Sequence, residues 1–342
     1  MSSHEVDEEF HGDTINQYGC ETVPLKQWGK NFVRRARRLN RANAAHGKGL
    51  LAWAQHYLPT HFRLTPSRMH RWLGEQLDRA VEQRGVKLNL IGPRGSAKST
   101  VATLAFVLRC AVEKQEAYIW IISDTSHQAT AHLNNVRWEL FENRRLRSDY
   151  HELFRQPPEA QGNIIRLHDG PTIEAYGSGQ HLRGKRRREH RPTLIICDDL
   201  QNDDHIRSSW RRDRSREWFQ GTLLKAGTKR TNIVNLATAL HRDALAMELD
   251  RTPGWISAIF KAIERWPTNM TLWHAWEQIY SNLEDPDRLE AARRFYQDHQ
   301  AAMTEGARLL WPEEEDLYTL MRMRAEGGRV AFEREKQGSP SS

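Results

Sequence analysis

The sequence predicts an α/β fold in which a largely parallel central sheet is flanked by helices, with further helical segments at both ends of the chain. After residue 87, short apolar runs alternate with helical patterns, which is typical of parallel sheets covered on both faces. A glycine-containing loop follows the first apolar run and opens a helix, and two carboxylates end a later run. Both features fall where open parallel sheets bind ligands, beyond the carboxyl ends of the strands.

Length and composition fit a globular chain with a substantial core. The 342 residues suffice for one large domain or two smaller ones. We expect an acidic tail and basic amphipathic helix (1–49), the α/β domain (50–268) and a helical region (269–342). The sequence has no apolar run of about 18 residues, as a membrane span needs, and its acidic start is unlike a signal peptide. Three cysteines at unrelated spacings indicate neither a disulfide framework nor a zinc site, so we expect a reducing, cytoplasmic location.

Positive charge is concentrated in three segments. The formal net charge is +7, and basic residues crowd in 30–49, 183–192 and 207–216. Such clusters suit a phosphate backbone as partner. A solvated, arginine-rich surface is the alternative for any single cluster, but three clusters in one chain favour nucleic acid.

Local patterns give the order of the elements. Residues 31–44 fit an amphipathic helix, and 50–82 fit two helices divided by a turn near Pro59 and Pro66. Beyond about residue 270 the pattern is helical. Between these regions we expect alternating strands and helices, namely a strand at 87–92, an amphipathic helix at 98–114, a strand at 117–123, a helix at 126–143, a hairpin within 163–177 that turns at Asp169-Gly170, a strand at 193–199, a helix at 207–225 and a strand at 231–238.

The segment "NLIGPRGSAKSTVATL" (89–104) is similar to a phosphate-binding loop. The strict pattern is Gly, four residues, Gly, Lys, and Ser or Thr. Gly92, Lys98 and Ser99 fit it, but Ala97 stands where the second glycine belongs, which is tolerable if its φ is negative. Gly95 remains available for a strained turn. The alternative is a chance loop before a helix.

In the phosphate-loop interpretation, the loop amides from Gly95 to Ser99 would converge on a β-phosphate, helped by the positive end of the following helix. Lys98 would bridge the β- and γ-phosphate oxygens, and the Ser99 hydroxyl would ligate Mg²⁺. We expect the nucleotide to contact Gly92, Pro93, Arg94, Gly95, Ser96, Ala97, Lys98, Ser99 and Thr100.

Hydrolysis also needs a carboxylate at the end of a neighbouring strand. The run "LIICDD" offers Asp198 for the Mg²⁺ shell and Asp199 to polarise the attacking water. Asp199 is one methylene shorter than the glutamate common in that role. Alternatively, one of the two aspartates caps the next loop, and Asp203 or Asp204 competes for these roles.

With these motifs placed, the chain resembles the large subunit of tailed-phage terminases, the motor that packages viral DNA. The resemblance covers roughly residues 50–338. It includes "PRGSAKST", because alanine often replaces the last glycine of the loop in that family. Three further stretches resemble the family in the right order, namely "ISDTSHQATAHLNNVRWELFENRRL", "GSGQHLRGKRRREHRPTLIICDD" and "NLATALHRDALAMEL". The resemblance implies a P-loop NTPase fold of the RecA/ASCE type, with ATP and Mg²⁺ as cofactors.

The resemblance also implies roles outside the two motifs. Thr238 matches the threonine that couples the γ-phosphate to movement, although a hydroxyl bonded to backbone is the simpler interpretation. Charge on the transferring phosphate needs another cation: Arg94 in cis, or Arg183 reaching a neighbouring subunit. Both arginines have DNA contact or structure as alternatives. Phe62 and His70 occupy the region of the family's adenine pocket.

Terminase large subunits usually continue into a nuclease that needs several carboxylates to hold two metals. Residues 309–340 resemble the helical connector that precedes it, so we expect no nuclease activity. The acidic run 312–316 is better explained as the first turn of a helix, and Asp285 and Asp287 likewise as helix-start residues. A separately encoded nuclease, a truncated gene or a shortened chain would each account for this.

The leading hypothesis is an ATP-driven translocase of double-stranded DNA. Family resemblance suggests a ring of subunits on a portal protein, a small terminase subunit as partner, and action at the procapsid portal in the host bacterial cytoplasm. The alternatives are another P-loop enzyme, such as a helicase or a small-molecule kinase, and a non-catalytic DNA-binding or assembly scaffold.

Overall fold

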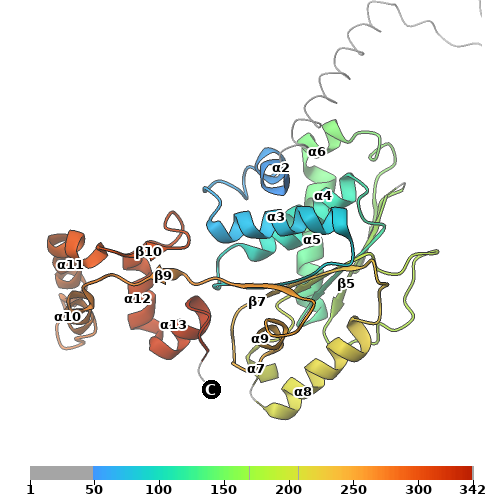
Figure 1. Cartoon of the computed structure of the whole chain (residues 1–342). Coiled ribbons are helices and arrows are strands. Elements are labelled where there is room, and N and C mark those ends of the chain that lie inside the picture. Colours follow the sequence, from blue (N-terminus) through green and yellow to red (C-terminus); the bar gives the residue numbers. More distant parts are fainter. Residues whose placement is uncertain (1–48, 169, 207, 341–342) are drawn as a thin grey trace, which may run out of the picture. The chain divides into compact units, whose positions relative to one another are not determined.

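The computed structural model describes residues 49–340 except 169 and 207, so the predicted acidic tail and the helix at 31–44 lie outside the described residues. Its centre is an eight-stranded sheet (Figure 1). The strands, in spatial order, are β3 (Glu159–Gln161), β4 (Ile164–Arg166), β5 (Thr172–Gly177), β2 (Tyr118–Ser123), β6 (Leu194–Asp198), β7 (Asn232–Ala237), β1 (Lys87–Ile91) and β8 (Ile256–Ile259).

The pairings from β5 to β8 are all parallel, which confirms the predicted largely parallel sheet. The two remaining pairings of this sheet, β3 with β4 and β4 with β5, are antiparallel, so β4 runs opposite to its neighbours. The predicted hairpin is formed by β4 and β5, with Ile165 opposite Ile173, although residue 169 of its turn lies outside the described residues. The sequence did not indicate β3 or β8, which are only three and four residues long.

Alternate residues of the buried strands point to opposite faces of the sheet. On β2, Ile119 and Ile121 join one apolar cluster, whereas Trp120 and Ile122 join another. The helices packed in the first cluster are α2 (Gly49–Tyr57), α3 (Arg68–Gln83), η1 (Thr100–Phe106), α4 (Val107–Val112), α5 (Ser126–Glu142) and α6 (Arg144–Asp149). Those that contribute to the second are α8 (Ser209–Trp218), η2 (Phe219–Leu223) and α9 (Leu245–Leu249), and the short helix α7 (Asp203–Ile206) contacts α8.

The helix that follows the glycine-containing loop differs from its prediction. Residues 101–112 are buried on every side, because η1 contacts α2, α3 and α5 as well as β6. The predicted amphipathic character is therefore wrong. Within this helix, η1 (residues 100–106) is π-helical. The predicted helix 207–225 also contains a π-helical segment, η2, at its end.

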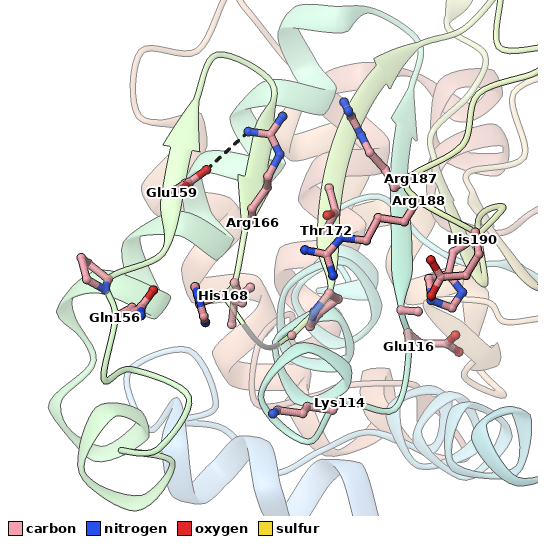
Figure 2. A pocket seen from close by; sticks show the side chains of 16 residues that line it. Lys114, Glu116, Gln156, Glu159, Arg166, His168, Thr172, Arg187, Arg188 and His190 are labelled. Atoms are coloured by element: carbon pink, nitrogen blue, oxygen red, sulfur yellow. Dashed lines mark ion pairs between the residues drawn. The ribbon is translucent and has the colours of Figure 1, made fainter.

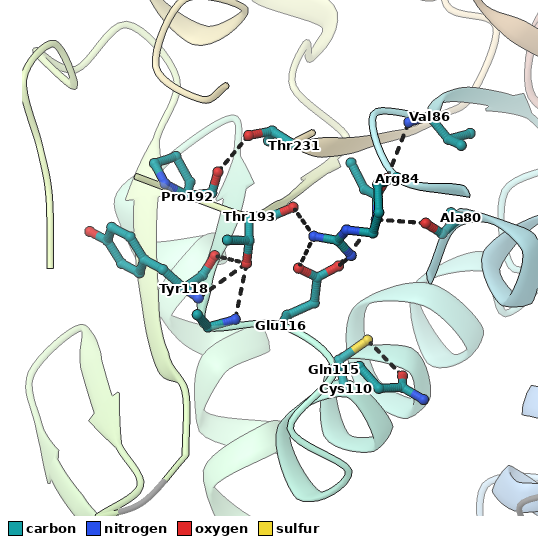
Figure 3. Close-up of polar contacts among 12 residues, drawn as sticks. Ala80, Arg84, Val86, Cys110, Gln115, Glu116, Tyr118, Pro192, Thr193 and Thr231 are labelled. Carbon is teal, nitrogen blue, oxygen red and sulfur yellow. Dashed lines mark hydrogen bonds and ion pairs between the residues drawn. The ribbon is translucent and has the colours of Figure 1, made fainter. Parts of the chain in front are cut away.

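A buried ion pair fixes the amino-terminal ends of the strands (Figure 3). The Arg84 guanidinium contacts both carboxylate oxygens of Glu116, at 2.5 and 2.7 Å. Nearby, the Thr193 hydroxyl accepts hydrogen bonds from the amides of Ala117 and Tyr118. These contacts tie the segments before β1, β2 and β6 together.

The region beyond residue 260 has its own apolar cluster, built around Trp273, Trp276 and Phe332. The prediction of helices is confirmed by α10 (Met270–Tyr280), α11 (Arg288–Thr304), α12 (Leu317–Gly327) and α13 (Arg329–Lys336). A small antiparallel pair, β9 (Ile263–Arg265) and β10 (Arg308–Leu309), was not predicted. None of the helices in the described part of the chain is long and apolar enough to cross a membrane.

Candidate functional site

The predicted phosphate loop connects β1 to the helix that begins at Lys98. Lys98 is only 6% exposed, and its ammonium donates hydrogen bonds to the carbonyls of Gly92 (3.1 Å) and Pro93 (2.8 Å). The Ser96 hydroxyl donates to the same Pro93 carbonyl at 2.6 Å. The carbonyl groups of the loop therefore surround the Lys98 ammonium. The amides in the first turn of the helix have no acceptor within the helix, and such amides form an anion-binding site.

Two residues of this loop have a left-handed backbone. Gly95 has φ +81°, as expected for a strained turn, and Ala97 has φ +54°. The condition under which alanine was judged tolerable, a negative φ, is therefore not met. A left-handed conformation costs a residue with a Cβ about 1–2 kcal/mol relative to a right-handed one. The loop keeps the glycine-type conformation at Ala97 despite the methyl group.

Asp198, at the end of β6, is brought to the loop by the sheet. Its Oδ1 accepts a hydrogen bond from the Ser99 hydroxyl at 3.0 Å, and its Oδ2 accepts one from Thr103 at 2.5 Å. His132 Nε2, on α5, lies 3.6 Å from Oδ2. Neither Thr103 nor His132 was predicted from the sequence as a site residue. For Thr103 a signal existed, because Ser99 and Thr103 are four residues apart on one helix face.

Asp199 follows β6 in a left-handed conformation, φ +49°. Its amide donates to Leu236 O on β7, and its carbonyl accepts from the Asp124 amide beyond β2, so neighbouring strands hold this backbone. Burial raises the pKa of Asp199, and the nearby Lys98 ammonium opposes that rise. Burial lowers the pKa of Lys98, while Asp199 and Asp198 raise it. The loop lysine and both aspartates thus form one electrostatic unit.

Thr238 directly follows β7, the strand between β1 and β6. It is 7% exposed and lines a small cleft with Asp199 and Gln201. The competing acids Asp203 and Asp204 lie on α7 and are exposed. Asp203 pairs with Arg334 at 3.1 Å rather than with the loop.

The two candidate arginines have different surroundings. Arg94, at the tip of the loop, has a side chain 60% exposed that pairs with Glu335 at 3.0 Å. Arg183 lies in the exposed segment after β5 and donates to the Gly221 carbonyl at 3.2 Å. Within the described chain, the structure brings Arg94 to the loop and leaves Arg183 at the surface.

A cavity of about 310 Å³ adjoins the loop at Ala97 and Thr100. Phe62 and His70 both line it, together with Trp311. Trp311 was not predicted from the sequence, because it lies more than 200 residues from the other two. The His70 ring meets the Trp311 ring edge-on, with centroids 4.6 Å apart. Burial lowers the pKa of His70, whose Nε2 lies 2.8 Å from the Ser96 carbonyl oxygen.

The acidic run 312–316 precedes α12 and does not form its first turn, so that expectation is wrong. Asp316 caps the helix by accepting a hydrogen bond from the Thr319 amide at 2.7 Å. Asp287 directly precedes α11, but its side chain makes no capping hydrogen bond. Glu313 accepts from the Thr65 amide at 2.9 Å. In the described residues no group of three or more His, Cys, Asp or Glu side chains is arranged to hold a metal ion.

The sheet order and the site together define a P-loop NTPase fold of the ASCE type, in which one additional strand, β7, separates the loop strand β1 from the carboxylate strand β6. The RecA/ASCE prediction is thereby confirmed. No family model matches the sequence, and a search of curated proteins found no relative.

Solved structures similar to this chain come from the class of protein that the motifs resemble. A mutant large terminase ATPase domain from Thermus phage P74-26 is 12% identical with a TM-score of 0.47, and the match covers 82% of this chain and 97% of that one. The large terminase of bacteriophage HK97 is 14% identical with a TM-score of 0.36, and the match covers 63% of this chain and 43% of that one. The Phi-28 gp11 DNA packaging motor is 10% identical with a TM-score of 0.31, and the match covers 67% of each chain. Such remote likeness transfers no residue's role.

Proposed function

We propose that this chain is an ATP-driven translocase of double-stranded DNA, the motor portion of a phage packaging machine. The observation that carries the ATPase part is the 3.0 Å contact between Ser99 Oγ and Asp198 Oδ1. It joins the phosphate loop to the carboxylate strand, as a shared metal–nucleotide site requires. Had Lys98 and Asp198 faced different sides of the sheet, this interpretation would have failed.

The residues fit ATP and Mg²⁺. Hydroxyl and carboxylate oxygens are the ligands Mg²⁺ prefers, and Ser99 and Asp198 supply one of each. A methyl group at Gly92 would lie 2.8 Å from Met69 Sδ and 3.1 Å from Lys98 Cδ, so a larger residue there would displace Met69 or the loop lysine. The cavity lined by Phe62, His70 and Trp311 adjoins the loop and suits a flat aromatic base.

Bound MgATP supplies the phosphoanhydride bond that is broken. Lys98 neutralises charge on the phosphates, while Ser99 and Asp198 hold the metal. Asp199 accepts a hydrogen bond from the attacking water, and its raised pKa makes it a better base than an ordinary aspartate. Thr238, at the end of the strand between the two motifs, reports the state of the γ-phosphate. Arg94 in cis and Arg183 in trans are the candidates for the further cation.

Two exposed basic segments support DNA as the partner. On α8, the Arg214 guanidinium lies 5.1 Å from the centre of the Trp210 ring, which is 62% exposed. In the segment 183–192, Arg187 is anchored by the buried carboxylate of Glu174, and Arg188 faces a cavity of about 600 Å³ (Figure 2). We expect these arginines to contact the phosphate backbone of DNA rather than the base edges. The affinity for DNA should therefore fall steeply as the salt concentration rises.

The wider assembly belongs to the same proposal. It comprises a ring of these chains on a portal protein in the host cytoplasm and a small terminase subunit for DNA recognition. In this proposal, residues 50–268 form the motor domain and residues 269–342 form a helical connector. A helicase and a non-catalytic scaffold are the rival functions.

The test is ATP hydrolysis with and without duplex DNA, on this chain alone and with added portal. We expect stimulation by DNA and loss of turnover in Lys98→Ala with DNA binding largely intact. Lys261→Ala, an exposed lysine outside the loop, is the control. Strand displacement on a forked duplex would indicate a helicase. Nucleotide binding without any hydrolysis, even on the portal, would indicate a scaffold.

A further inference from the structure

Three consecutive residues at the end of α13 contact both sides of the candidate nucleotide site. The Glu335 carbonyl accepts a hydrogen bond from the Arg94 amide at 2.9 Å, and its carboxylate pairs with the Arg94 guanidinium. The Lys336 ammonium donates to the Arg94 carbonyl at 2.8 Å. Arg334 pairs with Asp203, shortly after the carboxylate strand. The C-terminal helix is thus joined to the loop tip and to the segment after Asp199.

Lys336 places a second positive charge beside the phosphate loop. Its side chain is 11% exposed and pairs with Glu315. A methyl group built on Gly95 would lie 3.7 Å from its Nζ atom, which puts the ammonium at the loop tip. The pKa of Lys98, lowered mainly by burial, is lowered further by the charges of Arg94 and Lys336. Lys336 therefore acts on the same region of space as the loop lysine.

The partners of Lys336 can be exchanged. An ammonium has three donors, and that of Lys336 donates to the Arg94 carbonyl and to the Glu315 carboxylate. A terminal phosphate at the loop tip carries more negative charge than one carboxylate and offers several acceptor oxygens. It would compete with Glu315 for Lys336 and with Glu335 for Arg94.

We propose that Lys336 is a γ-phosphate-sensing residue: with a nucleoside triphosphate bound, its ammonium leaves Glu315 for an oxygen of the terminal phosphate. This inference rests on the proposed nucleotide site and adds a regulatory contact to it. Because Phe332 anchors the same helix in the C-terminal apolar cluster, the exchange shifts that cluster relative to the loop. Presence of the γ-phosphate is thereby communicated to residues 262–336.

The test compares the affinity for MgADP with that for the Mg²⁺ complex of the β,γ-imido analogue of ATP, by calorimetry on the full chain. In Lys336→Gln we expect the analogue to bind about tenfold more weakly, as for loss of one charge-assisted hydrogen bond, with ADP affinity nearly unchanged. In Glu315→Gln, which releases Lys336, the analogue should bind more tightly. Arg329→Gln removes an α13 cation that pairs with Glu277, away from the loop, and should change neither affinity.

Opposite effects of Lys336→Gln and Glu315→Gln on the affinity for the ATP analogue would distinguish γ-phosphate sensing from a purely structural role of Lys336. If Lys336 only holds α13 in place, both variants weaken both nucleotides, or melt earlier with the ratio of affinities unchanged, and the sensing role is wrong. If Lys336→Gln does not fold, an unchanged ratio in Glu315→Gln alone overturns it. Failure of the wild-type chain to bind either nucleotide would instead contradict the proposed function itself.

Discussion

Ser99 Oγ and Asp198 Oδ1 lie 3.0 Å apart although 99 positions separate them in the sequence. The contact exists because β6 and β1 end at the same edge of the sheet with only β7 between them. A second hydroxyl, from Thr103, holds the other oxygen of the same carboxylate. The carboxylate is therefore oriented before any ligand arrives, which is how preorganised metal ligands are held.

Replacing Ala97 by glycine should stabilise the fold. Its φ of +54° costs an alanine about 1–2 kcal/mol, and the greater entropy of an unfolded glycine offsets about half of the gain. We expect the free energy of unfolding to rise by about 0.5–1 kcal/mol in chemical denaturation. Ala105→Gly, in the buried helix, is the matched control and should destabilise by about 1 kcal/mol or more. Equal losses in both variants would show that Ala97 is not strained.

Thr103 should position Asp198. Thr103→Val keeps the shape but removes the hydrogen bond to the carboxylate, and we expect stability to fall by about 1–3 kcal/mol. The Mg²⁺ concentration that half-saturates nucleotide binding should rise in the same variant. Thr103→Ser retains a hydroxyl and should recover most of the Mg²⁺ response. A serine variant as impaired in Mg²⁺ response as the valine variant would argue for packing rather than positioning.

The environment of His70 predicts that the free energy of unfolding depends on pH. The Ser67 amide donates to Nδ1 at 3.0 Å and Nε2 faces the Ser96 carbonyl at 2.8 Å, so the partners require a neutral ring. Its pKa in the fold is lowered from 6.5, mainly by burial. The neutral His70 ring therefore stabilises the fold fully above about pH 6.5, and this stabilisation is lost as the pH falls through the lowered pKa.

The measurement is the free energy of unfolding of wild type and His70→Gln at pH 8 and at pH 5. The stability advantage of wild type should be larger at pH 8. Using the difference between the two proteins removes the titration of other histidines. A constant or increasing advantage at pH 5 would mean that the folded protein accommodates the protonated ring.

The ion pair between Arg84 and Glu116 should be important for stability. The Glu116 side chain is fully buried, so Glu116→Gln leaves the Arg84 charge without its counter-ion and should cost about 3 kcal/mol in thermal or chemical unfolding. Glu159→Gln breaks an exposed pair with Arg166 and should cost no more than about 0.5 kcal/mol. Comparable losses in the two variants would contradict the importance of burial.

The sequence by itself determined the fold class and the two motifs. Uninterrupted apolar runs such as 118–122 and 194–197 are typical of strands buried on both faces, and their alternation with helices indicates a parallel sheet. Lys98, Ser99, Asp198 and Asp199 were named from local spacing alone, and the sheet does bring them together. Their chemical roles remain predictions.

Only the tertiary structure decided which distant groups meet at the site. His132, Trp311 and Lys336 reach it because segments distant in the sequence pack against the loop there, and no local pattern records such convergence. The backbone at Ala97 is a similar case, because tertiary contacts override the preference of a single residue. The physical reason is that sequence patterns encode which face of an element is apolar, whereas side-chain contacts between elements depend on how those faces pack.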